Sequence, residues 1–197
     1  MPIIGEQGES VRVIPPVVPT DHIGGVNGFA RKARWFWPVL ATLVLGDCTT
    51  KELVVAELAG NPGPHPLVGE WVRLTLAYNP GATMNLSLGS SSRLVFSLVA
   101  LAAVIVLLQL YRRTPHDGVL RATSIALVAG GALGNLIDRI RSARGVVDFI
   151  DIGIGDNRFW TFNVADVGVT VGVILLAFVL WREDRLAGAA EARGSTV

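Results

Sequence analysis

The sequence has little of what soluble proteins and metalloenzymes depend on. Only 17% of its 197 residues are charged, whereas soluble domains carry about 25%. Its single cysteine, Cys48, excludes a disulfide within the chain and a cysteine-rich metal site. The three histidines, His22, His65 and His116, are too far apart in the chain to suggest a zinc site. A net charge of +1 gives no reason to expect nucleic-acid binding.

Hydrophobic residues make up 51% of the chain and gather in four long stretches. These are residues 35–56, 94–110, 120–137 and 164–181. About 20 mostly apolar residues are enough for a helix to cross a bilayer. The first stretch has Asp47, Lys51 and Glu52 in its second half, and we still expect it to span. The sequence therefore predicts a mainly α-helical integral membrane protein, a bundle of four transmembrane helices.

Basic residues indicate the orientation, because loops rich in Lys and Arg stay in the cytoplasm. Such residues precede the first stretch, separate the second from the third and follow the fourth, so both termini are predicted to be cytoplasmic. The segment between the third and fourth stretches breaks this trend with Arg139, Arg141, Arg144 and Arg158.

The chain divides into three predicted parts. Residues 1–30 mix Gly, Pro and polar residues without a period, which is typical of a disordered extension. Residues 31–185 form the four-helix transmembrane domain, and residues 186–197 form a cytoplasmic tail. Both end segments are expected in the cytoplasm.

Two segments outside the apolar stretches have the pattern of β-strands. Hydrophobic and polar residues alternate over residues 72–78, and residues 146–152 are β-branched and aromatic with acidic interruptions. We expect a small extracytoplasmic β-cradle that lies on the bundle and covers a site at the outer membrane face.

Polar residues recur in the same order where the third stretch ends and the fourth begins. Asn135 and Asp138 are three positions apart, as are Asn163 and Asp166, so each pair shares one helix face. The two helices meet at the outer face, which predicts that Asp138 and Asp166 lie together. Ionisable groups in membrane spans are costly and usually functional.

Two carboxyls in one partly dry site do not both ionise easily, so they share a proton. One then acts as general base on water while the other polarises a carbonyl, which is the chemistry of an aspartyl protease. The alternatives are structural: an aspartate at a span end can be an interfacial residue, and Asn163 can be a helix N-cap. Gly130 and Gly134 are explained by close helix packing.

A second polar pair, Asp47 and Lys51, lies one helical turn apart in the first stretch. An ion pair at this spacing lowers the cost of burying both groups, and we interpret it as supporting the site. Cys48 is interpreted as a packing residue.

Five motifs in the chain, taken in order, resemble those of signal peptidase II, the prolipoprotein signal peptidase. They are Asp47-x-x-x-Lys51, Asn79-Pro80-Gly81-Ala82, the segment GGALGNLIDR at 130–139, Val147-Asp148-Phe149, and Phe162-Asn163-Val164-Ala165-Asp166. The resemblance covers residues 35–182. It implies four transmembrane helices with cytoplasmic ends and an extracytoplasmic β-cradle.

The resemblance also implies roles for individual residues. Asp138 and Asp166 match the catalytic dyad, while Asp47 and Lys51 match supporting positions. The residues expected to contact substrate or inhibitor are Asn79, Gly81, Asn135, Arg139 and Asn163.

The family cleaves lipoprotein precursors just before a cysteine that carries diacylglycerol, without a metal or organic cofactor, and globomycin inhibits it. The expected partners are therefore prolipoprotein signal peptides, membrane lipids and globomycin-type inhibitors, and the expected location is the bacterial inner membrane. The alternative is a small transporter or proton-conducting protein that uses the same carboxyls. No Gly-x-Gly-Asp unit of the presenilin type is present, because Leu45-Gly46-Asp47 lacks the first glycine.

Overall fold

The computed structural model describes residues 25–81 and 91–194 of the chain. Within these ranges the chain forms four helices: α1 (Gly25–Leu58), α2 (Ser92–Arg113), α3 (Val119–Arg141) and α4 (Val164–Gly194). Each contains one of the four apolar stretches, and α4 begins at the residue where the sequence predicted it. Most of the N-terminal extension that we expected lies outside the described residues, and the division into three parts stays a prediction.

Three of these helices are long and apolar enough to cross a membrane, as judged over the described residues: α2, α3 and the first 26 residues of α4. The helix α1 does not meet this measure, since its apolar half is followed by Asp47 and Lys51. Both side chains are buried inside the protein.

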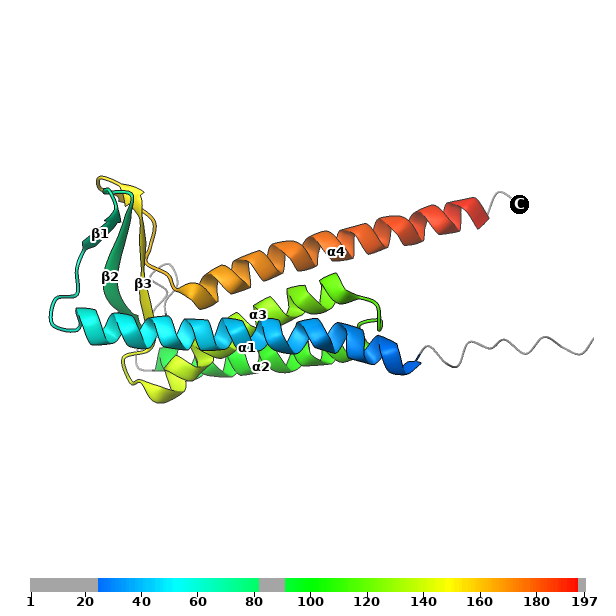
Figure 1. The fold of residues 1–197 in the computed structure, drawn as a ribbon, viewed down its shortest axis with the longest axis horizontal. Coiled ribbons are helices and arrows are strands. Elements are labelled where there is room, and N and C mark those ends of the chain that lie inside the picture. Colours follow the sequence, from blue (N-terminus) through cyan, green and yellow to red (C-terminus); the bar gives the residue numbers. More distant parts are fainter. Residues whose placement is uncertain (1–24, 82–90, 195–197) are drawn as a thin grey trace, which may run out of the picture.

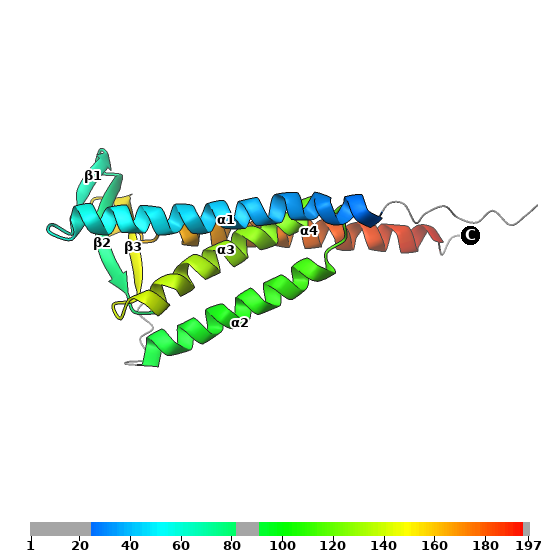
Figure 2. The same ribbon diagram turned by 60° about the horizontal axis from the view of Figure 1, so that its bottom comes forward.

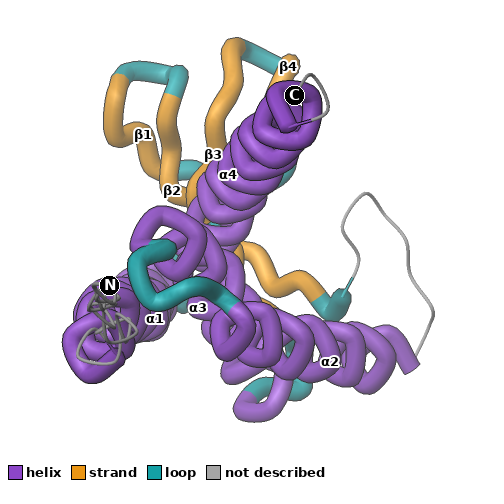
Figure 3. Tube along the Cα trace, turned by 90° about the vertical axis from the view of Figure 1, so that its right-hand side faces the viewer, coloured by secondary structure: helices purple, strands orange, loops and turns teal. Residues whose placement is uncertain are grey.

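The helices lie along one common axis, with a small sheet at the end where α1 ends and α4 begins (Figure 1). In the turned view, α3 lies between α1 and α2 (Figure 2). Seen along the axis, α2 and α4 extend from α3 in different directions, α4 upward and α2 to the right (Figure 3), and α3 packs against all three other helices. Figure 1 also shows α4 leaning away from α1 toward the end opposite the sheet, where the described chain begins and ends.

The sheet confirms both predicted strands and adds two short ones. Its strands are β1 (His65–Val68), β2 (Val72–Asn79), β3 (Val146–Ile154) and β4 (Asn157–Arg158), in that order and antiparallel throughout. The central pair joins a strand that follows α1 to one that follows α3. Leu76, Val147 and Phe149 bury their side chains against the end of α1. The sheet is thereby fixed on the helical bundle.

Glycines let α3 approach its two neighbours closely, as the sequence suggested. A side chain at Gly130 would press on Leu43 of α1 at 3.2 Å, and one at Gly134 would meet the Asp47 carboxylate at 2.6 Å. On the other face of α3, a side chain at Gly131 would collide with the backbone oxygen of Ala165 in α4.

A buried lysine ties α1 to α2 at the opposite end from the sheet. The Lys32 ammonium donates hydrogen bonds to the carbonyl oxygens of Tyr111 and Thr114, at 3.0 and 2.6 Å. These carbonyls belong to the end of α2, where helices leave acceptors without a partner in the helix. Phe36 stacks on the Tyr111 ring beside this contact, at 3.9 Å between centroids.

We expect Gly131→Ala to lower the thermal stability of the detergent-solubilised protein by several degrees, because the added methyl group collides with α4 backbone that cannot move without shifting the helix. Gly188→Ala is the matched control, since nothing lies within 4 Å of the added group. This control should be neutral or stabilising, because alanine favours helix by about 1 kcal/mol over glycine. Equal melting temperatures for the two variants would contradict close contact between α3 and α4.

Candidate active site

The first turn of α4 is capped by side chains from its own motif and from α1. The Asn163 side-chain oxygen accepts a hydrogen bond from the Asp166 amide at 3.0 Å, and Asp166 Oδ2 accepts one from the Asn163 amide at 3.2 Å. This reciprocal pattern is a capping box, which confirms the N-cap interpretation of Asn163. In the same turn, the Ala165 amide donates a hydrogen bond to Asp47 Oδ1 of α1 at 2.9 Å.

The side-chain amide of Asn163 reaches beyond this cap to three further groups, one of which is the Val147 carbonyl oxygen at 3.3 Å. It donates to Asp148 Oδ1 on β3 at 2.7 Å and to Asn135 Oδ1 on α3 at 3.0 Å. Asn163 is fully buried, so these bonds replace its contacts with solvent. One amide therefore links the start of α4 to both α3 and β3.

The carboxyl of Asp148 is held from the sheet side as well. The register of β2 on β3 pairs Ala77 with Asp148 and Asn79 with Val146. The Asn79 amide donates to Asp148 Oδ2 at 3.2 Å, while its oxygen accepts from the Gly81 amide at 3.0 Å. Gly81 has φ +131 and a side chain there would collide with Phe96, so this turn requires glycine.

A buried ammonium group organises the α1 and α3 side of the site. Lys51 Nζ lies 2.7 Å from Asp47 Oδ2 and 2.9 Å from Asp138 Oδ2, and it donates to Asn135 Oδ1 at 3.0 Å. The predicted ion pair between Asp47 and Lys51 is confirmed. The Asn135 amide, oriented in this way, donates to Asp166 Oδ1 at 2.8 Å.

These groups border a cavity of about 510 Å³ at the sheet end of the bundle. It is lined by four of the polar residues already described or expected, Asn79, Asn135, Asp148 and Asp166, by Arg139, and by apolar side chains that include Phe159, Trp160 and Phe162. Arg139 donates from Nη1 to the backbone oxygen of Asn135 at 3.2 Å.

The carboxyls that border the cavity are Asp148 and Asp166, and Asp138 is not among its lining residues. Asp138 accepts a hydrogen bond from the Val147 amide at 3.1 Å and pairs with Lys51 at 2.9 Å. The pairing of Asp138 with Asp166 as the catalytic dyad stays a prediction. The i, i+3 pattern relates residues within one helix, whereas Asp148 reaches the cavity from a strand.

Burial raises the pKa of Asp148 to about 6, and the nearby charge of Asp166 adds to this effect. The hydrogen bonds from Asn79 and Asn163 act in the opposite direction but do not cancel it. A raised carboxyl pKa next to a second carboxyl is the electrostatic condition for sharing a proton.

The other residues that the sequence predicted at the site lie at or beside the cavity. The structure brings Asn79, Asn135, Arg139 and Asn163 to the site, and Gly81 shapes the turn that orients Asn79. Asp148 was noted in the sequence only as part of a short motif. The signal available was an acidic residue interrupting a buried strand, which is uncommon unless the residue is paired or functional.

A second acidic residue of β3 has a different surrounding. Asp151 Oδ1 accepts from Arg158 at 2.6 Å, and Oδ2 accepts from Arg73 at 3.0 Å. Burial works against the charge of Asp151, but the hydrogen bonds from Arg158 and Arg73 outweigh it and lower the pKa of this carboxyl. Asp151 thus stabilises the sheet. Among the described residues, no three His, Cys, Asp or Glu side chains gather in a way that could hold a metal ion.

The apolar helices indicate a membrane protein, and two carboxyls border a cavity at one end of its bundle. Residues 39–182 match the family model described as signal peptidase (SPase) II. Among curated proteins, the lipoprotein signal peptidase of Moorella thermoacetica is 40% identical over 144 residues, covering 72% of this chain and 90% of the relative. The same-named protein of Syntrophotalea carbinolica is 37% identical and covers 74% and 90%.

A solved bacterial membrane enzyme has the same fold, with a TM-score of 0.66 and 28% identity over 75% of this chain and 88% of that one. The chain belongs to the signal peptidase II family. It is therefore a membrane peptidase.

We expect Lys51→Met to destabilise the protein by about 3 to 5 kcal/mol, because it leaves the Asp47 and Asp138 carboxylates buried without their cation. Arg141→Met is the matched control, since Arg141 pairs with Glu52 on the surface at 3.6 Å and surface pairs contribute little. Thermal unfolding in detergent measures both. A melting temperature for Lys51→Met that equals the control's would show that Lys51 does not hold the site together.

The raised pKa of Asp148 has a defined effect on stability. Because the folded-state pKa of about 6 exceeds the ordinary 3.8, the folded protein binds more protons between these values. Folding is therefore favoured at acidic pH, and about 2 kcal/mol of this advantage is lost as the pH rises from 4 to 7. Asp148→Asn should remove this part of the pH dependence in melting curves taken across that range. Identical pH slopes for wild type and variant would contradict the raised pKa.

Proposed function

We propose that this protein is an aspartyl endopeptidase that removes the signal peptide from diacylglyceryl-modified prolipoproteins, cutting just before the lipidated cysteine. The observation that carries the proposal is the pair of carboxyls, Asp148 and Asp166, that border one cavity and are joined through Asn163. The curated relatives named lipoprotein signal peptidase support the substrate class.

In the proposed mechanism, the two carboxyls share one proton. The ionised carboxyl takes a proton from a water molecule, whose oxygen attacks the scissile carbonyl carbon, while the protonated carboxyl donates a hydrogen bond to the carbonyl oxygen. As the tetrahedral intermediate collapses, the C–N bond breaks and the leaving amine receives a proton from the pair. The two aspartates titrate as a coupled unit, so neither is assigned the base alone.

The proposed dyad differs from the sequence expectation in one member. Asp138 has a cation within 2.9 Å, whereas the ion pairs known for the described residues include none with Asp148 or Asp166. The Asp138 carboxylate is already engaged within the fold, by the Lys51 ammonium and by the Val147 amide. The geometry therefore favours Asp148 as the second catalytic residue and Asp138 as a supporting one.

The remaining cavity residues have proposed roles around this dyad. Asn79 and Asn163 orient the Asp148 carboxyl, and Asn135 orients Asp166. Arg139 borders the cavity, and its Nε has no hydrogen-bond partner in the protein. We propose that its guanidinium group binds a substrate carbonyl. Phe159 and Trp160 provide an apolar wall for the lipid part of the substrate or for a globomycin-type inhibitor.

We propose that α1 is a fourth membrane span and that both termini are cytoplasmic. Support comes from Trp37, Leu45 and Leu53, which expose large apolar surfaces along α1, and from the burial of its charged pair. The sheet and the cavity then lie at the outer face of the bacterial inner membrane. A signal peptide within the bilayer would reach the dyad from there.

The test compares single variants in a gel-shift assay on a diacylglyceryl-modified prolipoprotein in detergent. Asp148→Asn and Asp166→Asn should each lower the cleavage rate at least about 100-fold, since a positioned acid or base contributes that much or more. Asp138→Asn should retain measurable cleavage, and globomycin should inhibit the wild type.

Asp117→Asn is the control, because Asp117 is exposed in the loop between α2 and α3. Loss of activity in Asp138→Asn together with normal cleavage by Asp148→Asn would restore the dyad expected from the sequence pattern. Normal cleavage by all of these variants would exclude an aspartyl mechanism.

A further inference from the structure

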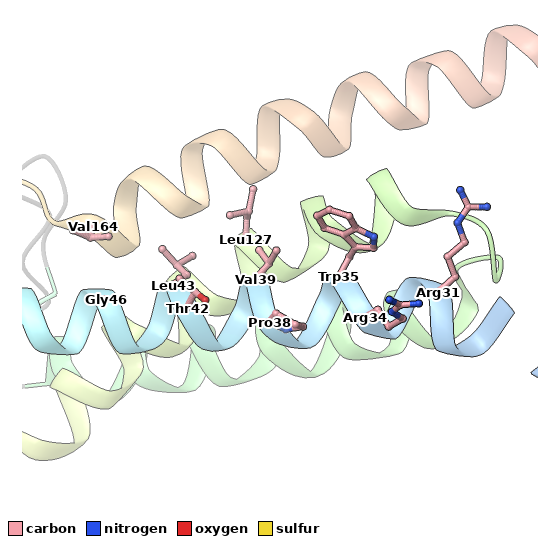
Figure 4. Close-up of a pocket in the computed structure, with 10 residues that line it drawn as sticks. All are labelled: Arg31, Arg34, Trp35, Pro38, Val39, Thr42, Leu43, Gly46, Leu127 and Val164. Atoms are coloured by element: carbon pink, nitrogen blue, oxygen red, sulfur yellow. The ribbon is translucent and has the colours of Figure 1, made fainter. Parts of the chain in front are cut away.

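A second groove, of about 1140 Å³, runs along α1 on the side from which α4 leans away. Its floor is apolar, with Val39 and Leu43 from α1 and Leu127 from α3 (Figure 4). At the sheet end it stops at Gly46 and Val164, next to the capped start of α4. The groove is thus separate from the catalytic cavity and lies along the helices.

Two arginines, Arg31 and Arg34, line the opposite end of the groove. They are three positions apart and share one helix face, and both are exposed. Figure 4 shows them beyond the apolar floor, with Trp35 between that floor and the arginines. Lys32 is directed elsewhere, to carbonyls at the end of α2. Within the part of the chain that the structure describes, no carboxylate pairs with either arginine.

The dimensions of the groove suit a lipid chain. Arg31 and Gly46 are fifteen residues apart on α1, which corresponds to about 22 Å along the helix. One leaflet of the hydrocarbon core is about 15 Å thick, so a chain starting at the arginines fits within this length. Trp35 is exposed beside the arginines, and tryptophan is enriched at the level of lipid headgroups.

We propose that this groove is a binding site for an anionic phospholipid. Its headgroup phosphate contacts Arg31 and Arg34, and an acyl chain lies along Val39 and Leu43. The unpaired positive charge of the two arginines favours an anionic lipid over a signal peptide. A signal peptide begins with basic residues, which the arginines would repel. The proposal depends on α1 lying in the membrane, which is part of the proposed function, but it does not depend on peptidase activity.

The experiment is native mass spectrometry of the full-length, delipidated protein in detergent, titrated with phosphatidylglycerol or with phosphatidylcholine of the same chains. Phosphatidylglycerol should bind more tightly. Arg31→Gln/Arg34→Gln should weaken its binding roughly 30-fold, because each basic residue near an anionic lipid strengthens binding about 5-fold. The control Arg112→Gln/Arg113→Gln removes two exposed charges at the end of α2, away from the groove, and should change little.

A second variant tests the groove without changing charge. Thr42→Trp places a large ring in the groove, where Thr42 is exposed, and should weaken phosphatidylglycerol binding as well. Equal binding of the two lipids, or equal losses in both double-arginine variants, would overturn the proposal. So would displacement of the lipid by a synthetic apolar signal helix, which would assign the groove to peptide. Cleavage assays on the same variants report separately on the peptidase.

Discussion

The ammonium group of Lys51 is enclosed by three oxygen atoms, and the positions of the other site residues follow from those contacts. Burying a charge costs several kcal/mol unless excellent geometry compensates it. Each of the three acceptor residues also makes a second contact, because Asp47 caps α4, Asp138 accepts an amide of β3, and Asn135 orients Asp166. One cation therefore holds α1, α3, α4 and the central sheet in a single arrangement.

This arrangement separates two kinds of carboxyl. Asp47 and Asp138 share the single cation of Lys51, and Asp151 has two arginines of the sheet beside it, so these ion pairs connect elements of the fold. Asp148 is instead surrounded by amide donors, which satisfy its oxygens without supplying a full positive charge. Burial then raises its pKa to about 6. The proposed catalytic carboxyl is therefore the one to which the protein supplies hydrogen bonds in place of a cation.

Regular patterns in the sequence predicted the helices and the two longer strands. They did not predict which side chains from different elements come into contact. The apolar stretches located all four helices, alternation located β2, and β-branched and aromatic residues located β3. Spacing also identified the pair Asp47 and Lys51, since both lie on one helix. The pairing of Asp148 with Asp166 that we propose was not expected from the sequence, because it depends on the register of β3 against β2 and on the path from β3 to α4, which no local period encodes.

Contacts within the fold also bear on the basic residues at the sheet end, which are an exception to the rule that Lys- and Arg-rich loops stay in the cytoplasm. Arg73 and Arg158 are bound to Asp151, Arg141 pairs with Glu52, and Arg139 contacts the end of α3. Arg31 and Arg34 have no such carboxylate among the described residues. Arginines that are already paired in the fold have little charge left to attract lipid headgroups, whereas unpaired ones keep it. Pairing removes Arg141 and Arg158 from the count of basic residues between α3 and α4 and leaves Arg139 and Arg144, which weakens the exception to the predicted orientation without removing it.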